Sequence, residues 1–312
     1  MNVLVTGATG FIGSNLVKRL LKRGWKVSVF VRNRKKLEED IQKKCKVVES
    51  DLVKFKEVNK ALRDIDVVFN LAAALPHHKL PELAYWNANV NGVRNIVEAS
   101  IRNKVKRLVH VSTVGIYGRS FIYSKTKLEG EKIVQKYSRK GLKTVIVRPT
   151  IAYGPGDTRP GFLNLLKLIK KGIFIPIGNG ENYFHTVYID NLTDALLLVA
   201  THPKAIREDF IIGDNPVPKM KQIISIMQKV TKKKIFPYYI PVGIAFLAAK
   251  IFDIFQKIGL PSPLNTQRVR FLTENLKFDT SKARKILGYK PRISLEKGIG
   301  YTYSWYKKKG YL

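Results

Sequence analysis

Gly7-Ala-Thr-Gly10-Phe-Ile-Gly13 is the stretch of the chain that decides its fold. It follows an apolar run, Asn2 to Thr6, that is typical of a buried strand, and it opens a helix pattern from Phe11 to Lys22. Glycines in such a turn permit a tight reversal, a close approach of the backbone to a pyrophosphate, and tight packing of helix on strand. The N–H groups and the dipole of the helix favour phosphate at this end. The turn therefore predicts a dinucleotide-binding site.

The first half of the chain continues this alternation of strands and helices. Helix patterns lie at 81–102 and 123–139, and the further strands are expected at 26–31, 46–49, 66–71, 107–112 and 144–148. Parallel strands need crossover connections, so this order predicts an α/β fold with a Rossmann-type, doubly wound parallel sheet. After Pro149 the alternation weakens and Pro and Gly become frequent. We therefore predict a dinucleotide-binding core over 1–150 and a smaller, mixed substrate lobe over 151–312, with some segments returning to the core.

The charge of the chain is strongly positive, with 57 Lys and Arg against 23 Asp and Glu and a formal net charge of +34. An excess of this size first suggests nucleic acid or an anionic membrane as a partner. The basic residues are spread over both halves, without a basic arm or the aromatic interleaving of a single-strand binder. We therefore expect no nucleic-acid partner. The single cysteine, Cys45, excludes a disulfide scaffold and fits a cytoplasmic location.

An arginine stands at the end of the second expected strand, which reads Phe30-Val-Arg32-Asn-Arg34-Lys35. An acid at this point would accept hydrogen bonds from the ribose of NAD, whereas an arginine can pair with a 2′-phosphate. Arg32, supported by Arg34 or Lys35, therefore favours NADP(H) over NAD(H). The alternative is that these are solvated side chains of an already basic protein.

A phenol and an ammonium lie four residues apart in Tyr123-Ser-Lys-Thr-Lys127, on one face of the expected helix. The pKa of a free tyrosine is about 10, so a tyrosine that acts as a base needs a nearby cation such as Lys127. Thr113 follows a strand and can hydrogen-bond the same substrate oxygen. Chance often produces Tyr-x-x-x-Lys, but its combination with the glycine turn indicates an enzyme.

These motifs resemble the extended short-chain dehydrogenase/reductase superfamily, in its NAD(P)-dependent epimerase/dehydratase branch, over essentially the whole chain. The resemblance rests on the turn 6–13 and Tyr-x-x-x-Lys, together with Asp51-Leu52, Leu71–Ala73, Asn89–Gly92, Ser112–Gly118, Arg148-Pro149, 154–156, 187–190 and 279–291.

The resemblance implies hydride transfer between a carbinol carbon and C4 of the nicotinamide, coupled to proton transfer through Tyr123. Tyr123 would be the general acid/base, Lys127 would assist it and bind the nicotinamide ribose, and Thr113 would orient the reacting oxygen. Ser112 and His185 are expected to contact the substrate. A homodimer is implied by the family. The expected cofactor site comprises Gly7, Thr9, Gly10, Phe11, Ile12, Gly13, Arg32, Asp51, Leu52, Leu71, Ala72, Ala73, Asn89, Lys127 and Pro149.

No metal site is expected, because His77-His78 lack a third ligand nearby in the sequence.

The substrate is indicated by departures from the pattern of nucleotide-sugar enzymes. Phe184 and His185 stand near the place where such enzymes carry a diphosphate-binding arginine, and only four residues separate Gly118 from Tyr123. The stretch 235–259 is unusually apolar and resembles the branch that includes 3β-hydroxysteroid dehydrogenase-like enzymes, whose substrates are hydrophobic. It is either a helix of the second lobe or an amphipathic element in peripheral contact with a membrane.

Together these features predict an oxidoreductase that acts on a hydroxyl or ketone of a hydrophobic or lipid-linked small molecule. The first alternative is a nucleotide-sugar epimerase or dehydratase. A second, from another class, is a non-catalytic dinucleotide-sensing or RNA-binding module on the same fold. The presence of Thr113, Tyr123 and Lys127 together counts against the latter.

Overall fold

The computed structural model describes residues 1–76, 80–118, 121–236, 238–257 and 264–312, which form two compact units. Unit 1 comprises Met1–Ala152, Ile189–Ile212 and Asp279–Lys290. Unit 2 comprises Tyr153–Tyr188, Gly213–Phe278 and Pro291–Leu312. His77 and His78 lie outside the described residues.

Unit 1 is built on a seven-stranded sheet in the order β3-β2-β1-β4-β5-β6-β9, and every neighbouring pair is parallel. The predicted doubly wound fold is thus confirmed. The order reverses direction between β1 and β4, the switch point at which such sheets bind ligands. The strands are β1 (Asn2–Thr6), β2 (Lys26–Val31), β3 (Lys46–Glu49), β4 (Val67–Asn70), β5 (Arg107–Val111), β6 (Thr144–Pro149) and β9 (Asp209–Ile212).

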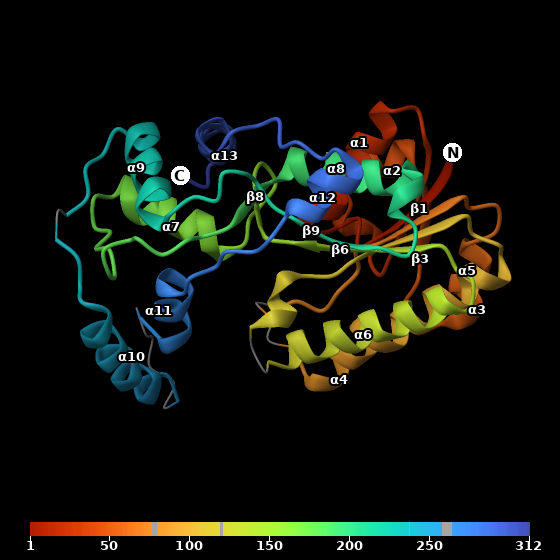
Figure 1. The fold of residues 1–312 in the computed structure, drawn as a ribbon, viewed down its shortest axis with the longest axis horizontal. Coiled ribbons are helices and arrows are strands. Elements are labelled where there is room, and N and C mark those ends of the chain that lie inside the picture. The colour runs from red at the N-terminus through yellow and green to blue at the C-terminus, as the bar shows by residue number, and fades with distance from the viewer. Residues whose placement is uncertain (77–79, 119–120, 237, 258–263) are drawn as a thin grey trace. The chain divides into compact units, whose positions relative to one another are not determined.

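The central strands β4, β5 and β6 are buried at every residue, because helices cover both faces of the sheet. Figure 1 shows α1 and α8 on one face and α3, α5 and α6 on the other. The helices of unit 1 are α1 (Phe11–Lys22), η1 (Arg34–Lys36), α2 (Glu39–Lys44), α3 (Phe55–Ala61), α4 (Glu82–Trp86), η3 (Asn87–Asn91), α5 (Gly92–Arg102), η4 (Val114–Tyr117), α6 (Ile122–Arg139), α8 (Ile189–Thr201), η5 (Pro203–Ala205) and α12 (Ser281–Leu287).

One detail of unit 1 differs from the sequence expectation, and a second makes specific the expected return of a later segment to the core. The helical stretch expected at 81–102 contains a π-helical turn, η3, between α4 and α5. The seventh strand, β9, comes from beyond residue 150 and pairs with β6, with Ile146 opposite Asp209. A four-residue strand is too short for its hydrophobic pattern to be distinguished from a buried loop.

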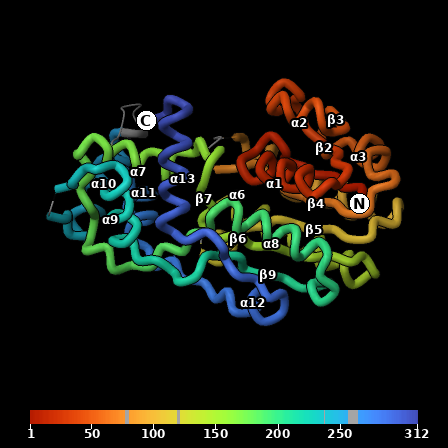
Figure 2. Tube along the Cα trace, turned by 90° about the horizontal axis from the view of Figure 1, so that it is seen from above, coloured from red at the N-terminus to blue at the C-terminus, as the bar shows by residue number. Residues whose placement is uncertain are grey.

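Unit 2 contains α7 (Pro160–Lys170), β8 (Thr186–Tyr188), α9 (Met220–Thr231), α10 (Val242–Lys257), α11 (Thr266–Thr273) and α13 (Leu295–Lys308), and β7 (Ile151–Tyr153) runs into it from unit 1. α9 packs against both α7 and α13 (Figure 2). α10 packs against α11 through Ala245, Ala249 and Val269. None of the described helices is both long and apolar enough to cross a membrane.

Candidate active site

The glycine turn between β1 and α1 is closely packed against the backbone of the sheet. Gly7 has a φ of +72°, and a Cβ at this position would lie 2.8 Å from the backbone nitrogen of Ala72. A Cβ on Gly13 would lie 2.1 Å from the carbonyl oxygen of Gly7. No side chain caps α1 and no acidic residue lies in its first turn. The backbone cradle and the uncapped positive end of the helix dipole therefore fit a dinucleotide pyrophosphate.

A chain of hydrogen bonds joins the ends of β1, β4 and β5 beside this turn. The Thr6 hydroxyl accepts from the backbone N–H groups of Leu71 and Ala72, at 3.1 Å each, and donates to Asn70 Oδ1 at 2.7 Å. Asn70 Nδ2 lies 3.1 Å from His110 Nδ1. We call Thr6, Asn70 and His110 the Thr6 clamp; it was not predicted from the sequence, although polar residues inside apolar strands are a signal for such a contact. This clamp holds the backbone of Leu71 and Ala72 against the glycine turn.

Tyr123 and Lys127 lie on the N-terminal half of α6, as predicted. Lys127 is buried, and its Nζ donates to the carbonyl oxygen of Val111 at 2.8 Å. Burial lowers the pKa of the Lys127 ammonium to about 8, although the nearby Glu131 carboxylate acts in the opposite direction. The helix therefore presents a phenol followed, one turn later, by a buried cation.

Thr113 lies in the turn that packs against the beginning of α6. Its hydroxyl caps η4 by accepting from the N–H of Gly115 at 3.0 Å, and α6 contacts η4. A Cβ on Gly115 would lie 3.9 Å from Ser124 Oγ. The structure thus brings the turn of Thr113 to the end of α6 that carries Tyr123.

Asn89 is buried in the π-helical turn and connects two parts of the site. Its Oδ1 accepts from the N–H of Ala74 at 2.9 Å, and its Nδ2 donates to Thr126 Oγ1 at 3.0 Å. A Cβ on Gly130 would lie 2.4 Å from the Asn89 carbonyl oxygen, so α6 approaches this turn closely because it has glycine there. Asn89 therefore joins the segment after β4 to the helix of Tyr123.

The other predicted residues of unit 1 lie where parallel strands end on the same edge of the sheet. Arg32 follows β2 and is exposed, and among the described residues it forms no hydrogen bond or ion pair. Ser112 directly follows β5 and is buried, and its hydroxyl lacks a partner within the described chain. The remaining members of this edge are Thr9, Gly10, Phe11 and Ile12 beyond β1, Asp51 and Leu52 beyond β3, and Pro149 at the end of β6.

His185 is the one predicted site residue that belongs to unit 2. It is fully buried, its Nε2 lies 3.0 Å from the Asp214 carbonyl oxygen, and its Nδ1 accepts from the N–H of Phe278 at 3.3 Å. Burial lowers the pKa of this imidazole. Both ring nitrogens thus have partners within unit 2, and a contact of His185 with substrate stays a prediction. Among the described residues, no group of His, Cys, Asp and Glu is arranged to hold a metal ion.

Comparison with known proteins identifies relatives along the whole chain. The model of the NAD dependent epimerase/dehydratase family matches residues 3–213. The chain is 29% identical to a decarboxylating sterol-4-alpha-carboxylate 3-dehydrogenase of Candida albicans, over 97% of each chain. It is 26% identical to the N-acetyl-alpha-D-glucosaminyl-diphospho-ditrans,octacis-undecaprenol 4-epimerase of Escherichia coli O157:H7, over 96% of this chain and 94% of the other. Among solved structures, UDP-glucuronic acid 4-epimerase of Bacillus cereus in complex with NAD superimposes with a TM-score of 0.78 and 26% identity, over 99% of each chain.

Proposed function

Because the chain belongs to the NAD dependent epimerase/dehydratase family, of the extended short-chain dehydrogenase/reductase type, we propose that it is a dehydrogenase or reductase for a hydroxyl or ketone on a hydrophobic or lipid-linked small molecule. The observation that carries this proposal is the joint presence of the glycine cradle with Thr113, Tyr123 and Lys127 around the ends of the sheet strands.

Each residue has a distinct role in this reaction. The glycine cradle would hold the pyrophosphate of a nicotinamide dinucleotide, which when bound would supply the hydride acceptor or donor. Tyr123 removes the proton from the substrate hydroxyl, or returns it to the carbonyl oxygen in reduction. Lys127 stabilises the phenolate, since a cation beside a phenol favours its charged form. Thr113 donates to the same oxygen and holds the carbon toward the cofactor.

The names of two relatives support a hydrophobic or lipid-linked substrate, since one acts on a sterol carboxylate and the other on an undecaprenol-linked sugar. The test is a panel of steroid alcohols, apolar ketones and nucleotide sugars, each with NADPH or NADP⁺. Net oxidation or reduction of the cofactor with an apolar member is the expected result. Activity on nucleotide sugars alone would contradict the proposal.

A second candidate function is a nucleotide-sugar 4-epimerase or dehydratase. It is favoured by the epimerases among the relatives, including a UDP-glucose 4-epimerase of Vibrio cholerae. The two candidates differ in one measurable quantity. An epimerase inverts the sugar carbon with no net change in the cofactor, whereas a dehydrogenase changes one cofactor molecule for each product.

The preferred cofactor is proposed to be NADP(H), because Arg32 is exposed and unpaired within the described chain at the end of β2. Arg32→Asp is expected to lower the affinity for NADPH about tenfold and to raise that for NADH, because a carboxylate repels the 2′-phosphate and accepts from a ribose hydroxyl. Calorimetric titration with both cofactors measures the change. Lys36→Asp, an equal charge change in η1, is the control and should alter both affinities little. Equal cofactor preference before and after Arg32→Asp would refute the assignment.

Peripheral membrane contact through 235–259 is also proposed, from the surface of α10; residues 237, 258 and 259 of this stretch lie outside the described residues. Ile244, Leu247, Ile251 and Ile254 are each half or more exposed and recur at helical spacing, while Ala245 and Ala249 on the other side are buried. Asp253, the acid of α10, accepts from the backbone N–H of Thr266 on α11. A basic run, 232–234, precedes this region. An apolar face beside basic charge fits a bilayer that contains anionic lipid.

Leu247→Glu is expected to weaken sedimentation with vesicles of phosphatidylglycerol and phosphatidylcholine about tenfold, because it places a charge on the apolar face. Leu83→Glu on α4 is the matched control, since Leu83 is 68% exposed and Leu247 64%. Vesicles of phosphatidylcholine alone should bind the unaltered protein more weakly. Equal binding of the unaltered protein and the Leu247→Glu variant to the anionic vesicles would exclude this face as the contact.

A further inference from the structure

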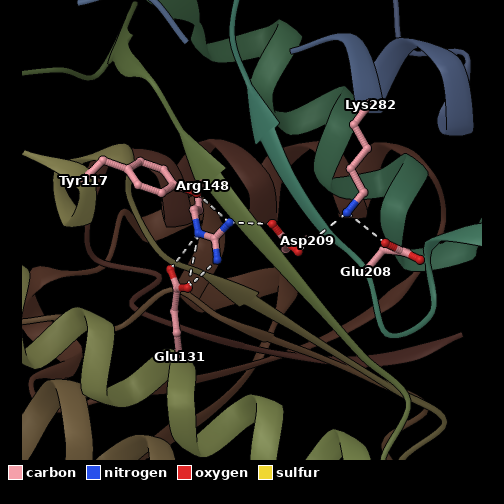
Figure 3. Close-up of polar contacts among 6 residues, drawn as sticks. All are labelled: Tyr117, Glu131, Arg148, Glu208, Asp209 and Lys282. Carbon is pink, nitrogen blue, oxygen red and sulfur yellow. Dashed lines mark hydrogen bonds and ion pairs between the residues drawn. The ribbon is translucent and has the colours of Figure 1, made fainter. Parts of the chain in front are cut away.

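Arg148, on β6, lies at the centre of an ionic cluster that the proposed reaction does not use (Figure 3). Its guanidinium binds both carboxylate oxygens of Glu131 on α6, with Nε 3.0 Å from Oε1 and Nη2 2.6 Å from Oε2. A third nitrogen, Nη1, donates to Asp209 on β9 and, at 2.8 Å, to the hydroxyl of Tyr117 at the end of η4. Arg148 is 7% exposed and Glu131 1%. One buried guanidinium thus connects four elements of unit 1.

Glu131 lies one helical turn beyond Lys127, and Lys127 lies one turn beyond Tyr123. The three side chains therefore follow one another on one face of α6. A buried carboxylate at this spacing from an ammonium would ordinarily pair with it. Here both oxygens of Glu131 are bound to Arg148, and Lys127 donates to the Val111 carbonyl oxygen instead. In the described part of the chain, Lys127 forms no ion pair.

We infer that Arg148 is a positioning residue for the reaction: it holds the Glu131 carboxylate away from Lys127, so that the positive charge of Lys127 acts on the Tyr123 phenol. This inference rests on the proposed function, which gives Tyr123 its acid/base role. Arg148 also contacts Tyr117, at the opposite end of the turn that Thr113 caps. The helix of Tyr123 and the turn of Thr113 are thereby held by the same group.

The charged groups around Lys127 determine the direction of the effect. Glu131 lies on the same face of α6, and its charge raises the pKa of Lys127, whereas Glu129, the other acid of this helix, pairs with Lys132. His110 on β5 is neutral, because burial and the Lys127 ammonium hold its pKa well below the usual value. Arg148 on β6 compensates Glu131. Removing Arg148 leaves a negative charge beside Lys127 and opposes ionisation of the phenol, whereas removing the Glu131 charge promotes that ionisation.

The test is a pH titration of the Tyr123 phenolate by its near-ultraviolet absorbance, with NADP⁺ present and the Tyr123→Phe spectrum subtracted. Arg148→Met is expected to raise the midpoint by about one pH unit, and Glu131→Gln to lower it. The double variant, which removes both charges, should return close to the unaltered protein. In oxidation near neutral pH, Arg148→Met should lower kcat about tenfold with KM nearly unchanged, and kcat should recover at higher pH.

The outcomes separate this inference from the proposed function. If every folded variant keeps the midpoint of the unaltered protein, the positioning role of Arg148 is wrong and the assignment of Tyr123 stands. If the unaltered protein shows no phenolate that titrates below the ordinary range of tyrosine, the assignment of Tyr123 itself fails. Arg148→Met leaves a buried acid and is the variant at risk of not folding. In that case the positioning role is tested by the midpoint of the Tyr123 titration, which should fall in Glu131→Gln and return toward the unaltered value in the double variant.

Discussion

Tyr123→Phe is expected to lower turnover about a thousandfold while the affinity for NADPH stays nearly unchanged. The substitution removes one hydroxyl, and with it the proton transfer that a positioned acid/base contributes. It leaves the glycine cradle, Asn89 and the Thr6 clamp intact. The measurement combines steady-state kinetics on the substrate found in the panel with calorimetric titration of the cofactor.

Tyr137→Phe is the matched control for this variant, because Tyr137 lies on the same helix and its hydroxyl donates to Glu98 on α5 at 2.8 Å. It should leave turnover within about twofold of the unaltered protein, since its contact joins α5 to the C-terminal end of α6, opposite to the end that carries Tyr123. Turnover by Tyr123→Phe close to that of the Tyr137→Phe control would remove the basis for the proposed reaction.

Gly13→Ala is expected to weaken cofactor binding at least about tenfold and to lower the free energy of unfolding by about 1–3 kcal/mol. The new methyl group would lie 2.1 Å from the Gly7 carbonyl oxygen and 2.7 Å from its carbonyl carbon, so α1 or the turn must move. Either movement displaces the backbone that receives the pyrophosphate. Calorimetric titration with NADPH and urea denaturation measure the two effects.

Gly300→Ala in α13 is the control for this substitution, because its Cβ would meet no atom within 4 Å. Alanine has the higher helix propensity, so this variant should gain about 0.5–1 kcal/mol and bind NADPH normally. An equal gain in stability at position 13 would show that the turn does not pack against α1 as described.

The sheet strands and the cofactor turn could be predicted because their signals are local. Each of the first six strands is an apolar run close to a Gly-rich turn or a helix pattern, and the turn 7–13 carries its own glycine pattern. The placement of Tyr123 and Lys127 on one face of a helix could be predicted for the same reason, since residues four apart on a helix share a face.

The remaining features depend on pairings between residues far apart in the chain. Thr6, Asn70 and His110 meet because β4 lies between β1 and β5 in the sheet. This order of the strands cannot be predicted from any short sequence motif. Arg148 reaches Asp209 because β9 is the neighbour of β6. The expectation of one continuous helix over 81–102 missed the π-helical turn, because η3 depends on the burial of Asn89 against α6.

The order in which unit 1 is assembled also constrains how it can be synthesised. Strand β9 of the sheet belongs to the segment Ile189–Ile212, and helix α12 belongs to the segment Asp279–Lys290. In both cases the chain has first passed through unit 2. Until β9 has left the ribosome, β6 is an edge strand with unpaired backbone groups, and Arg148 lacks its Asp209 partner. In the nascent chain this edge of β6 therefore stays unpaired while about sixty further residues are synthesised, which takes several seconds at ordinary translation rates.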